Sequence, residues 1–487
     1  MSCKGTNIAA VAVDHFAKCT LENMLYGPFH TSANVNMLSQ VKISHQVAVH
    51  NYVKTDGHRL EFGGSSQYRI SKSLDHMNAA VLCLILPQVR LRHDSKINHL
   101  ASLRFAPNWM AKLVRRIRLY VQDLLLTEAD TFAQLMHINS FIRHEHRENI
   151  NVMMGNTEEF LGQGAHNGSE FDPVGLNREV CMPLALFAVS HGSVGNAFHS
   201  GAAIFNDIHI EVELNEIADV LEIHNGPCGT QALDGTENGR AATFNDVETC
   251  DGNCPEVLNS YIMVDGAVGS PEEKKALARM VATRPIKLYS YTITDQFNPY
   301  GETVTTLRLS LGIVAILAAV VNVTHGRASC NFSTLPNGLG VSPWEEMELR
   351  FENTVRHCTT PVLSIHSHTS FAGTPGEQLA YFALFPFSFD FASPHLTSSL
   401  QASRVSDLVL HTRASAEAGL AADGFDQNRM AIPVAQGHEA CLDSQDDNVK
   451  DTQNHLLPGQ KQRFVIAAVA AQVAIIKYVR GSVQMII

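Results

Sequence analysis

Histidine and cysteine are the residues in this sequence whose types and spacing could bind a metal ion. The chain has 24 His and 10 Cys among 487 residues. His366 and His368 would share one face of a predicted strand, and Cys250 and Cys254 could chelate from one loop. Neither pair has a matching second pair at a recognisable distance. We interpret them as surface histidines and loop thiols, and expect no metal and no cofactor. Weaker candidates are His144-Glu145-His146 and His357-Cys358.

Nucleophilic catalysis has one candidate segment, Ser190-His191-Gly192-Ser193. It does not fit the G-x-S-x-G turn, which needs a residue between the first glycine and the serine. The sequence also has no Walker A motif and no G-x-G-x-x-G after a predicted strand, so phosphate binding is unsupported. We therefore expect no catalytic residue and no enzymatic activity.

Composition limits the partners. A net charge of −12 argues against a protein that coats nucleic acid, because neutralising phosphates needs a surplus of Lys and Arg. We expect protein partners instead. The cysteines are scattered and sparse, which favours a reducing compartment. The apolar runs are too short for a signal peptide or a membrane span, so a soluble intracellular chain is expected. Three sequons, at Asn167, Asn322 and Asn331, are therefore interpreted as unmodified.

The stretch from Phe205 to Ile223 is the clearest structural signal. From Asp207 to Leu214 polar and apolar residues alternate without a break, which places every apolar side chain on one face of a strand. Strands with one buried and one wet face are typical of antiparallel sheets, because strands of parallel sheets are usually covered on both faces. The pattern predicts a β-sandwich.

The other elements follow from the same patterns. Leu113 to Val121 alternates too, and we interpret its arginines as a solvated strand face rather than a basic groove. Helices are predicted at His15 to Leu25, from Glu128 to Arg147, and after the N-cap Ser270. Surface loops are predicted at Gly155 to Asn177, at 224–256 and from Arg413 to Lys461. Further strands are predicted at Val41–His50, Arg59–Phe62, Ala79–Leu86, Tyr261–Val264, Ile286–Ile293, Val304–Val323, Glu346–Phe351, Pro361–His366, Leu379–Phe389 and Val405–Thr412, before an apolar segment at Phe464–Val479.

Phe205-Asn206-Asp207-Ile208-His209-Ile210 is similar to a Tyr-Asn/His-Glu-Ile/Val-Arg/Lys-Ile segment of the major capsid proteins of iridoviruses and related large DNA viruses. Other segments resemble motifs of the same family, in the same order along the chain. Two segments depart from the family: its aromatic-rich Phe-Phe/Trp-Phe-x-Arg is replaced by Leu186 to Ser190, and its Gln-Pro-Ser-Gly turn by His395 to Ser398. The other similar segments are Met153 to Thr157, Met182 to Leu184, Val321 to His325, Phe351 to Arg356, Ser393 to His395 with Arg404, and Ile475 to Ile487.

The resemblance implies an all-β fold of two consecutive eight-stranded antiparallel jelly rolls with short helices in the loops. Residues 1–40 would form an N-terminal arm, 41–223 the first jelly roll, 224–256 a Gly-rich linker and 257–487 the second jelly roll. The strand beginning near Asp207 would close the first of them. It would have Ile208, Ile210, Val212 and Leu214 on its core face.

The resemblance also implies a function. The chain would be a structural subunit that assembles as homotrimeric, pseudo-hexagonal capsomers in the icosahedral shell of a virion, formed in the host cytoplasm. Its partners would be its own copies, neighbouring capsomers, minor capsid proteins and an internal viral membrane, without direct contact to nucleic acid. Two alternatives stay open: a metal-dependent β-sandwich enzyme or carbohydrate-binding module that uses the histidines, and a degenerate capsid-like protein that no longer assembles.

Overall fold

The structure is a computed structural model of the whole chain. It describes residues 49–70, 74–92, 101–106, 108–138, 144–161, 164–167, 170–175, 178–186, 198, 200–203, 206–225, 240–241, 246–268, 283–294, 297–309, 312–323, 332, 341–352, 354–372, 381–388, 399–401, 407–423, 461–479 and 482–486. The predicted arm, the helices at His15 and Ser270 and most of the polar stretch before Lys461 lie outside these residues.

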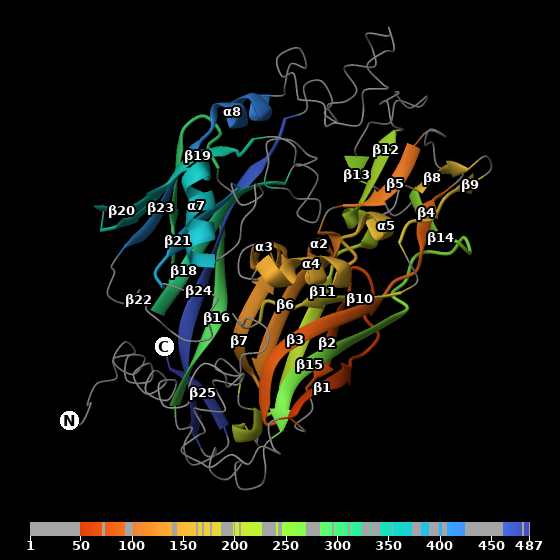
Figure 1. Ribbon diagram of the computed structural model, residues 1–487, viewed down its shortest axis with the longest axis horizontal. Coiled ribbons are helices and arrows are strands. Elements are labelled where there is room, and N and C mark those ends of the chain that lie inside the picture. Colours follow the sequence, from red (N-terminus) through yellow and green to blue (C-terminus); the bar gives the residue numbers. More distant parts are fainter. Residues whose placement is uncertain are drawn as a thin grey trace.

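Two four-stranded antiparallel sheets form the first half of the molecule (Figure 1). In the first sheet the order is β1 (Val49–Asp56), β15 (Asn259–Val268), β3 (His76–Ile85) and β10 (Glu179–Pro183). The second sheet has the order β2 (Ser65–Arg69), β11 (Ile208–Leu214), β6 (Val114–Val121) and β7 (Leu124–Asp130). Side chains from both sheets meet in one large core, so this half is a β-sandwich.

Strand β11 confirms the alternating pattern of the sequence. Ile208, Ile210, Val212 and Leu214 are buried, and the residues between them are partly exposed. Its position differs from the prediction, because β11 pairs with β2 on one side and β6 on the other and so lies inside its sheet. The strand does not close the first sandwich, which continues to β15.

The second half repeats the architecture with two more antiparallel sheets. One has the path β16 (Thr283–Thr294), β24 (Phe464–Val479), β18 (Gly312–Asn322) and β21 (Phe382–Pro386), with β22 (Leu400–Gln401) paired to β18 and β25 (Ser482–Ile486) paired to β24. The other has the order β17 (Glu302–Thr306), β23 (Leu408–Ala414), β19 (Trp344–Phe351) and β20 (Thr354–Thr359). The fold is therefore two sandwiches in one chain.

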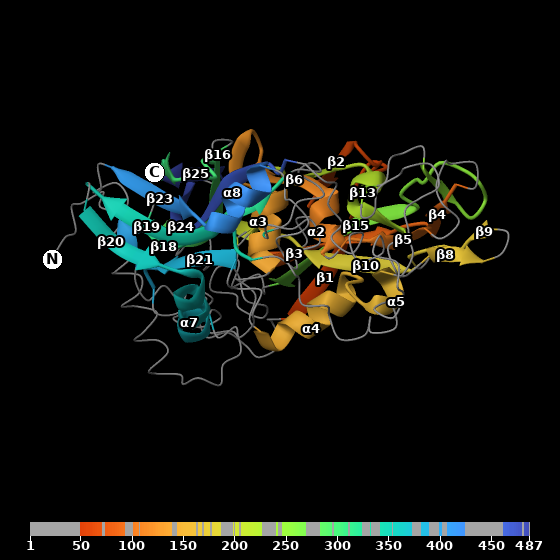
Figure 2. The same ribbon diagram turned by 90° about the horizontal axis from the view of Figure 1, so that it is seen from above.

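The sheet that contains β18 and β24 is buried on both faces. Every residue of β18 from Gly312 to Asn322 is buried. Ile316, Ala318 and Val320 belong to the core of the second sandwich, whereas Leu317 and its alternate neighbours belong to the large core that also contains the first sandwich. The two sandwiches lie side by side across this sheet (Figures 1 and 2), with β16 near β7 and α3 near β24. The halves therefore share a continuous core.

Smaller elements lie around the ends and edges of the sandwiches. The helices are α2 (Trp109–Leu113), α3 (Thr131–Met136), α4 (His144–Met153), α5 (Glu158–Leu161), α7 (Pro361–Ala372) and α8 (Ala416–Asp423). A small sheet contains β5 (Ala101–Phe105), β8 (Gly164–Asn167), β9 (Glu170–Phe171), β12 (Leu221–Asn225) and β13 (Arg240–Ala241), and β4 (Val89–Leu91) pairs with β14 (Val247–Thr249). Short 3-10 turns occur at Ser200–Ala202 and Ile217–Val220. Among the described helices, none has the length and apolar character that a membrane crossing requires.

Several further sequence predictions need correction. The predicted strand Val304–Val323 is two separate strands, β17 and β18, and the predicted loop from Gly155 to Asn177 contains α5, β8 and β9. The predicted strand from Pro361 is helix α7. The predicted helix from Glu128 begins at Thr131, because Glu128 to Asp130 end strand β7. No strand occurs at 59–62. Finally, β15 pairs with β1 and β3, so the first sandwich extends to Val268 and its partner cannot begin at residue 257.

Candidate functional site

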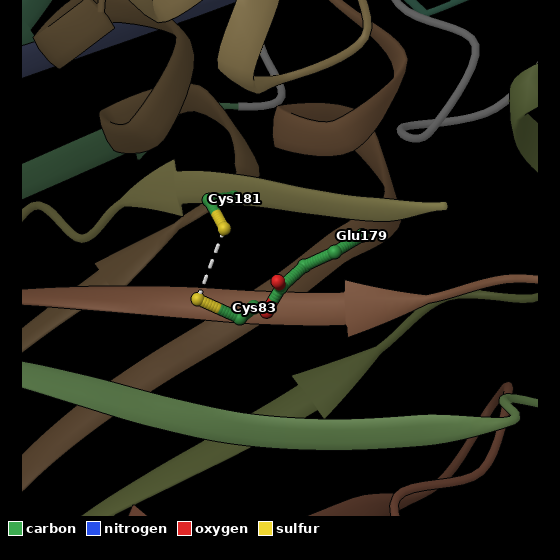
Figure 3. Close-up of side chains that lie close together, drawn as sticks. All are labelled: Cys83, Glu179 and Cys181. Atoms are coloured by element: carbon green, nitrogen blue, oxygen red, sulfur yellow. Dashed lines mark hydrogen bonds between the residues drawn. The ribbon is translucent and has the colours of Figure 1, made fainter. Parts of the chain in front are cut away.

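Two cysteines face each other across strands β3 and β10 (Figure 3). Leu82 and Leu84 of β3 point into the large core, so Cys83 between them points to the opposite face of the sheet. Cys181 is its direct cross-strand partner in the register of β10. The two Sγ atoms are 3.0 Å apart and share a hydrogen bond. Both are free thiols.

Polar groups from three further positions line this thiol pair. Glu179 lies two residues before Cys181 on β10, and its carboxylate accepts a hydrogen bond from the hydroxyl of Tyr261 on β15. Tyr261 is the partner of Cys83 on the other side of β3. The ammonium group of Lys54 lies 4.2 Å from the centre of the Tyr261 ring. In the register of the sheet Asp56, Tyr261, Cys83 and Cys181 form one row, and Lys54 reaches the Tyr261 ring diagonally from a position two residues before Asp56.

The two thiols differ in acidity. The hydrogen bond with Cys181 raises the pKa of the Cys83 thiol, and burial raises it further. The same hydrogen bond lowers the pKa of Cys181, because the Cys83 thiol stabilises a neighbouring thiolate. Cys83 is fully buried, whereas Cys181 is partly exposed. Cys181 is therefore the member of the pair that loses its proton first and meets solvent.

A second cluster lies on strands β19 and β20. The thiol of Cys358 donates a hydrogen bond to Glu346 over 2.8 Å, and Glu348 lies beside them. Burial, followed by the charge of Glu346, raises the pKa of Cys358 to about 11. Both carboxylates already hold arginines, Glu346 with Arg413 at 2.9 Å and Glu348 with Arg350 at 2.6 Å. This arrangement neutralises the acidic groups, which makes it a poor cation site.

The predicted histidine pair does not form. Because the segment is helical, His366 and His368 point in different directions rather than along one strand face. His366 is exposed, whereas His368 is buried with its Nδ1 atom 2.9 Å from the carbonyl oxygen of Ser364. The interpretation of both as surface histidines is wrong for His368.

The remaining sequence candidates have mixed outcomes. Cys250 and Cys254 are exposed free thiols near β14, as predicted. Asn322 is buried and its side-chain amide donates a hydrogen bond to Gln462, so its sequon lies inside the protein. The segment Ser190 to Ser193 and Asn331 lie outside the described residues, as do the side chains of His144, Glu145, His146 and Asn167.

The arginines of β6 occupy a solvated strand face, as predicted. Arg115 pairs with Glu213 at 3.0 Å, and Arg116 pairs with Glu128 at 3.1 Å. Arg118 lies between Glu128 and the next strand's Glu211, at 3.4 and 3.6 Å. These cross-strand pairs balance the positive charge, so the stripe is not a basic groove.

Sequence reasoning missed the pair of Cys83 and Cys181. Their separation of 98 residues has no motif, and only the register of β3 and β10 brings them together. The available signal was weak: Cys83 lies in a predicted strand whose neighbours Leu82 and Leu84 alternate with it. Cys181 follows Val180 and precedes Met182, which fits the same alternation. Neither segment alone, however, predicts that the two strands pair with each other.

Comparison with known proteins gives a consistent result. A family profile described as "Major capsid protein N-terminus" matches residues 38–265 and so ends within β15. The major capsid protein of Frog virus 3 (isolate Goorha) is 23% identical over 380 residues, which cover 73% of this chain and 77% of that protein. The major capsid protein of Lymphocystis disease virus 1 (isolate Darai) is 20% identical over 272 residues, 54% of each chain.

Solved structures agree on the fold. PBCV-1 VP54, in a crystal structure fitted into a reconstruction of the virophage Sputnik, has a TM-score of 0.62 at 12% identity, covering 92% of this chain and 98% of that one. The Faustovirus major capsid protein has a TM-score of 0.59 at 9% identity, covering 96% and 98%. The collinear motifs, the two packed sandwiches and these likenesses have one explanation. The chain has the double jelly-roll fold of these solved capsid proteins, and its sequence is similar to the major capsid proteins of iridoviruses.

Proposed function

We propose that this chain is the building block of an icosahedral virus shell and that it assembles as a homotrimer with a pseudo-hexagonal outline. The observation that carries the proposal is the sheet whose strands β18 and β24 contribute alternate side chains to the large core and to the core of the second sandwich. A shared core fixes two bodies of similar architecture side by side. Three such chains around an axis would present six sandwiches, which suits tiling on a hexagonal lattice.

The surfaces of the sandwiches support a structural role. The outward face of β6 and β11 carries paired arginines and glutamates, and the corresponding face of β19 and β23 carries Glu346 with Arg413. Such charged faces are well hydrated, and their charges can determine how neighbouring subunits align against one another. The negative net charge of the chain supports a shell that does not touch nucleic acid directly.

We also propose the finer features that the family implies. The chain would act without catalysis, in the capsid of a virion assembled in the host cytoplasm. Its neighbours would be other capsomers, minor capsid proteins and an internal membrane. The rival metal-dependent enzyme or carbohydrate-binding module has lost its main support, because His366 and His368 do not share a face.

Molar mass in solution tests the trimer. The full chain of 53.3 kDa should elute as a species of about 160 kDa, three times the chain mass, in size-exclusion chromatography with light scattering. Negative-stain images should show particles of hexagonal outline. The mass should be unchanged by a chelator, since no metal holds the trimer in this proposal. A monomer at micromolar concentration would remove the capsomer and leave the fold standing.

A further inference from the structure

We propose that Cys83 and Cys181 form an intrachain disulfide when the protein meets a small-molecule disulfide such as oxidised glutathione. The bond would join β3 to β10 on the face of the sheet opposite the core (Figure 3). This modification site is separate from the proposed assembly, and it holds whether or not the chain forms trimers.

The backbone places the two cysteines correctly. The amide of Leu184 donates to the carbonyl of Ala80, and these residues are cross-strand partners, so they form a hydrogen-bonded pair. Hydrogen-bonded and non-hydrogen-bonded pairs alternate along an antiparallel ladder. Counting three positions along β3 to Cys83 gives a non-hydrogen-bonded pair, whose Cα atoms lie about 4.5 Å apart. That separation is within the range of about 4.4–6.8 Å found in disulfides.

The sulfur atoms suit a disulfide better than a metal. Two thiolates on one tetrahedral zinc ion, each about 2.3 Å from the metal, would lie about 3.8 Å apart. The Sγ atoms of Cys83 and Cys181 are closer, at 3.0 Å, and need to approach by about another 1 Å to bond. Glu179 could serve as a third metal ligand, but its carboxylate already accepts a hydrogen bond from the hydroxyl of Tyr261.

Exposure and acidity divide the roles of the two thiols. Cys181 is partly exposed and its pKa is lowered, so it is the attacking thiolate. Cys83 is fully buried with a raised pKa, which protects it from direct attack by a bulky oxidant. It can act only on a sulfur that is already beside it, namely Cys181.

The exchange balances in two steps. The Cys181 thiolate attacks one sulfur of oxidised glutathione, forms a mixed disulfide and releases one glutathione thiolate. Cys83 then loses its proton to solvent or to that thiolate, attacks Sγ of Cys181 and expels the second glutathione thiolate. Two protein thiols are oxidised, and one molecule of oxidised glutathione is reduced to two molecules of glutathione.

The bond would fasten an edge strand. β10 has five residues, lies at the end of its sheet and pairs only with β3 along the described chain. Its last residue, Pro183, has no amide hydrogen to donate. A link between residues 98 positions apart also closes a long loop, which restricts the unfolded chain. The oxidised protein should therefore melt several degrees higher than the reduced protein.

Differential alkylation with peptide mass spectrometry tests the site. The full chain, reduced and treated with chelator to exclude metal, is incubated with oxidised glutathione, denatured and alkylated. The expected product is a linked pair of peptides containing Cys83 and Cys181, lighter by two hydrogen atoms. The Cys250→Ser, Cys254→Ser double variant should give the same product. Alkylation of both Cys83 and Cys181 in the oxidised wild type would overturn the proposal.

Single variants separate the two steps. In Cys83→Ala, which keeps a small apolar side chain in the buried position, glutathione should remain attached to Cys181 because the resolving thiol is gone. In Cys181→Ser, Cys83 should acquire no glutathione, and the oxidant should no longer raise Tm. A stable glutathione adduct on Cys181 of the folded wild type would contradict the proposed resolution by Cys83. Circular dichroism confirms that each variant is folded.

Discussion

Replacing Leu317 with alanine tests whether the two sandwiches depend on one core. Leu317 lies on β18, is fully buried, and belongs to the core that also contains the first sandwich. If the sandwiches were separate bodies with water between them, this side chain would face solvent and its loss would matter little. In the structure it should behave as a core residue.

The expected magnitude follows from the atoms removed. Leucine to alanine deletes three carbon atoms, and each buried CH₂-sized group contributes about 0.8 kcal/mol, or about 2.4 kcal/mol in all. Incomplete collapse of the surrounding sheet adds a cavity term, and fully buried Leu→Ala changes cost about 2.7–5 kcal/mol in a well-studied series. We expect the free energy of unfolding to fall by about 3 kcal/mol.

Urea unfolding, followed by tryptophan fluorescence and by circular dichroism, measures this loss. The midpoint should fall by somewhat less than 1 M, because the denaturant slope m grows with chain size and should exceed about 3 kcal/mol/M here. Trp109 and Trp344 lie in different sandwiches, so the fluorescence reports on both, and it should change together with the circular dichroism. Val304→Ala is the control, since Val304 is 58% exposed on β17 and should change stability by less than about 0.5 kcal/mol. A Leu317→Ala variant no weaker than that control would refute the shared core.

Three further outcomes are expected. Ile210→Asp should prevent folding of the first sandwich, because it buries an unpaired carboxylate on β11. The control Glu211→Gln, on the other face of β11, should leave a soluble, folded chain. A cooperative thermal unfolding transition of the Ile210→Asp variant would contradict the burial of this strand face. Intact-mass analysis after expression in a glycosylating cell should find no glycan on Asn322, which is buried against Gln462, and an occupied sequon there would contradict its burial. Alkylation of Cys358 should be about 100-fold slower near neutral pH than that of an ordinary thiol, because its raised pKa favours the neutral thiol. The alkylation rate should increase with pH up to about 11. A rate that stops increasing below pH 9 would contradict the hydrogen bond to Glu346.

Alternation predicted strands well where one face of a strand is wet. β11 and β6 were recognised because their polar residues reach solvent and their apolar residues reach the core. The same rule could not interpret β18, whose apolar run from Gly312 to Val321 carries no alternation. That run exists because the first sandwich covers the face of β18 that would otherwise meet solvent. The strands of the first sandwich lie far from β18 in the sequence.

The error at α7 had a local signal that was overlooked. The hydroxyl of Thr360 accepts a hydrogen bond from the amide of Leu363, and Pro361 occupies the first helical position. A threonine N-cap followed by proline is a favourable helix start. The apolar residues at Val362, Leu363 and Ile365 suggested a strand, yet Val362 and Leu363 are exposed on the helix surface.

The predicted domain boundary at residue 257 was wrong for a different reason. Glycine and proline are dense between residues 224 and 256, which predicted a loop, yet the described residues of this range include the short strands β13 and β14. Composition cannot say which sheet the next strand enters, and β15 returns to lie between β1 and β3. Register between distant strands is a tertiary property. The same limit hid the facing cysteines, whose meeting depends wholly on how β10 pairs with β3.

The doubly buried sheet explains why the two halves act as one body. Alanines at 315, 319, 467 and 471 lie opposite one another in β18 and β24 on the face turned to the larger core. Small side chains there allow α3 to approach β24 closely, which a wet face would not require. Had this face evolved for solvent, polar residues would alternate along β18 as they do along β11. Without the first sandwich, the second sandwich would expose a large apolar face, which soluble monomers rarely do. The sequence of the second sandwich therefore requires the first sandwich to cover this face.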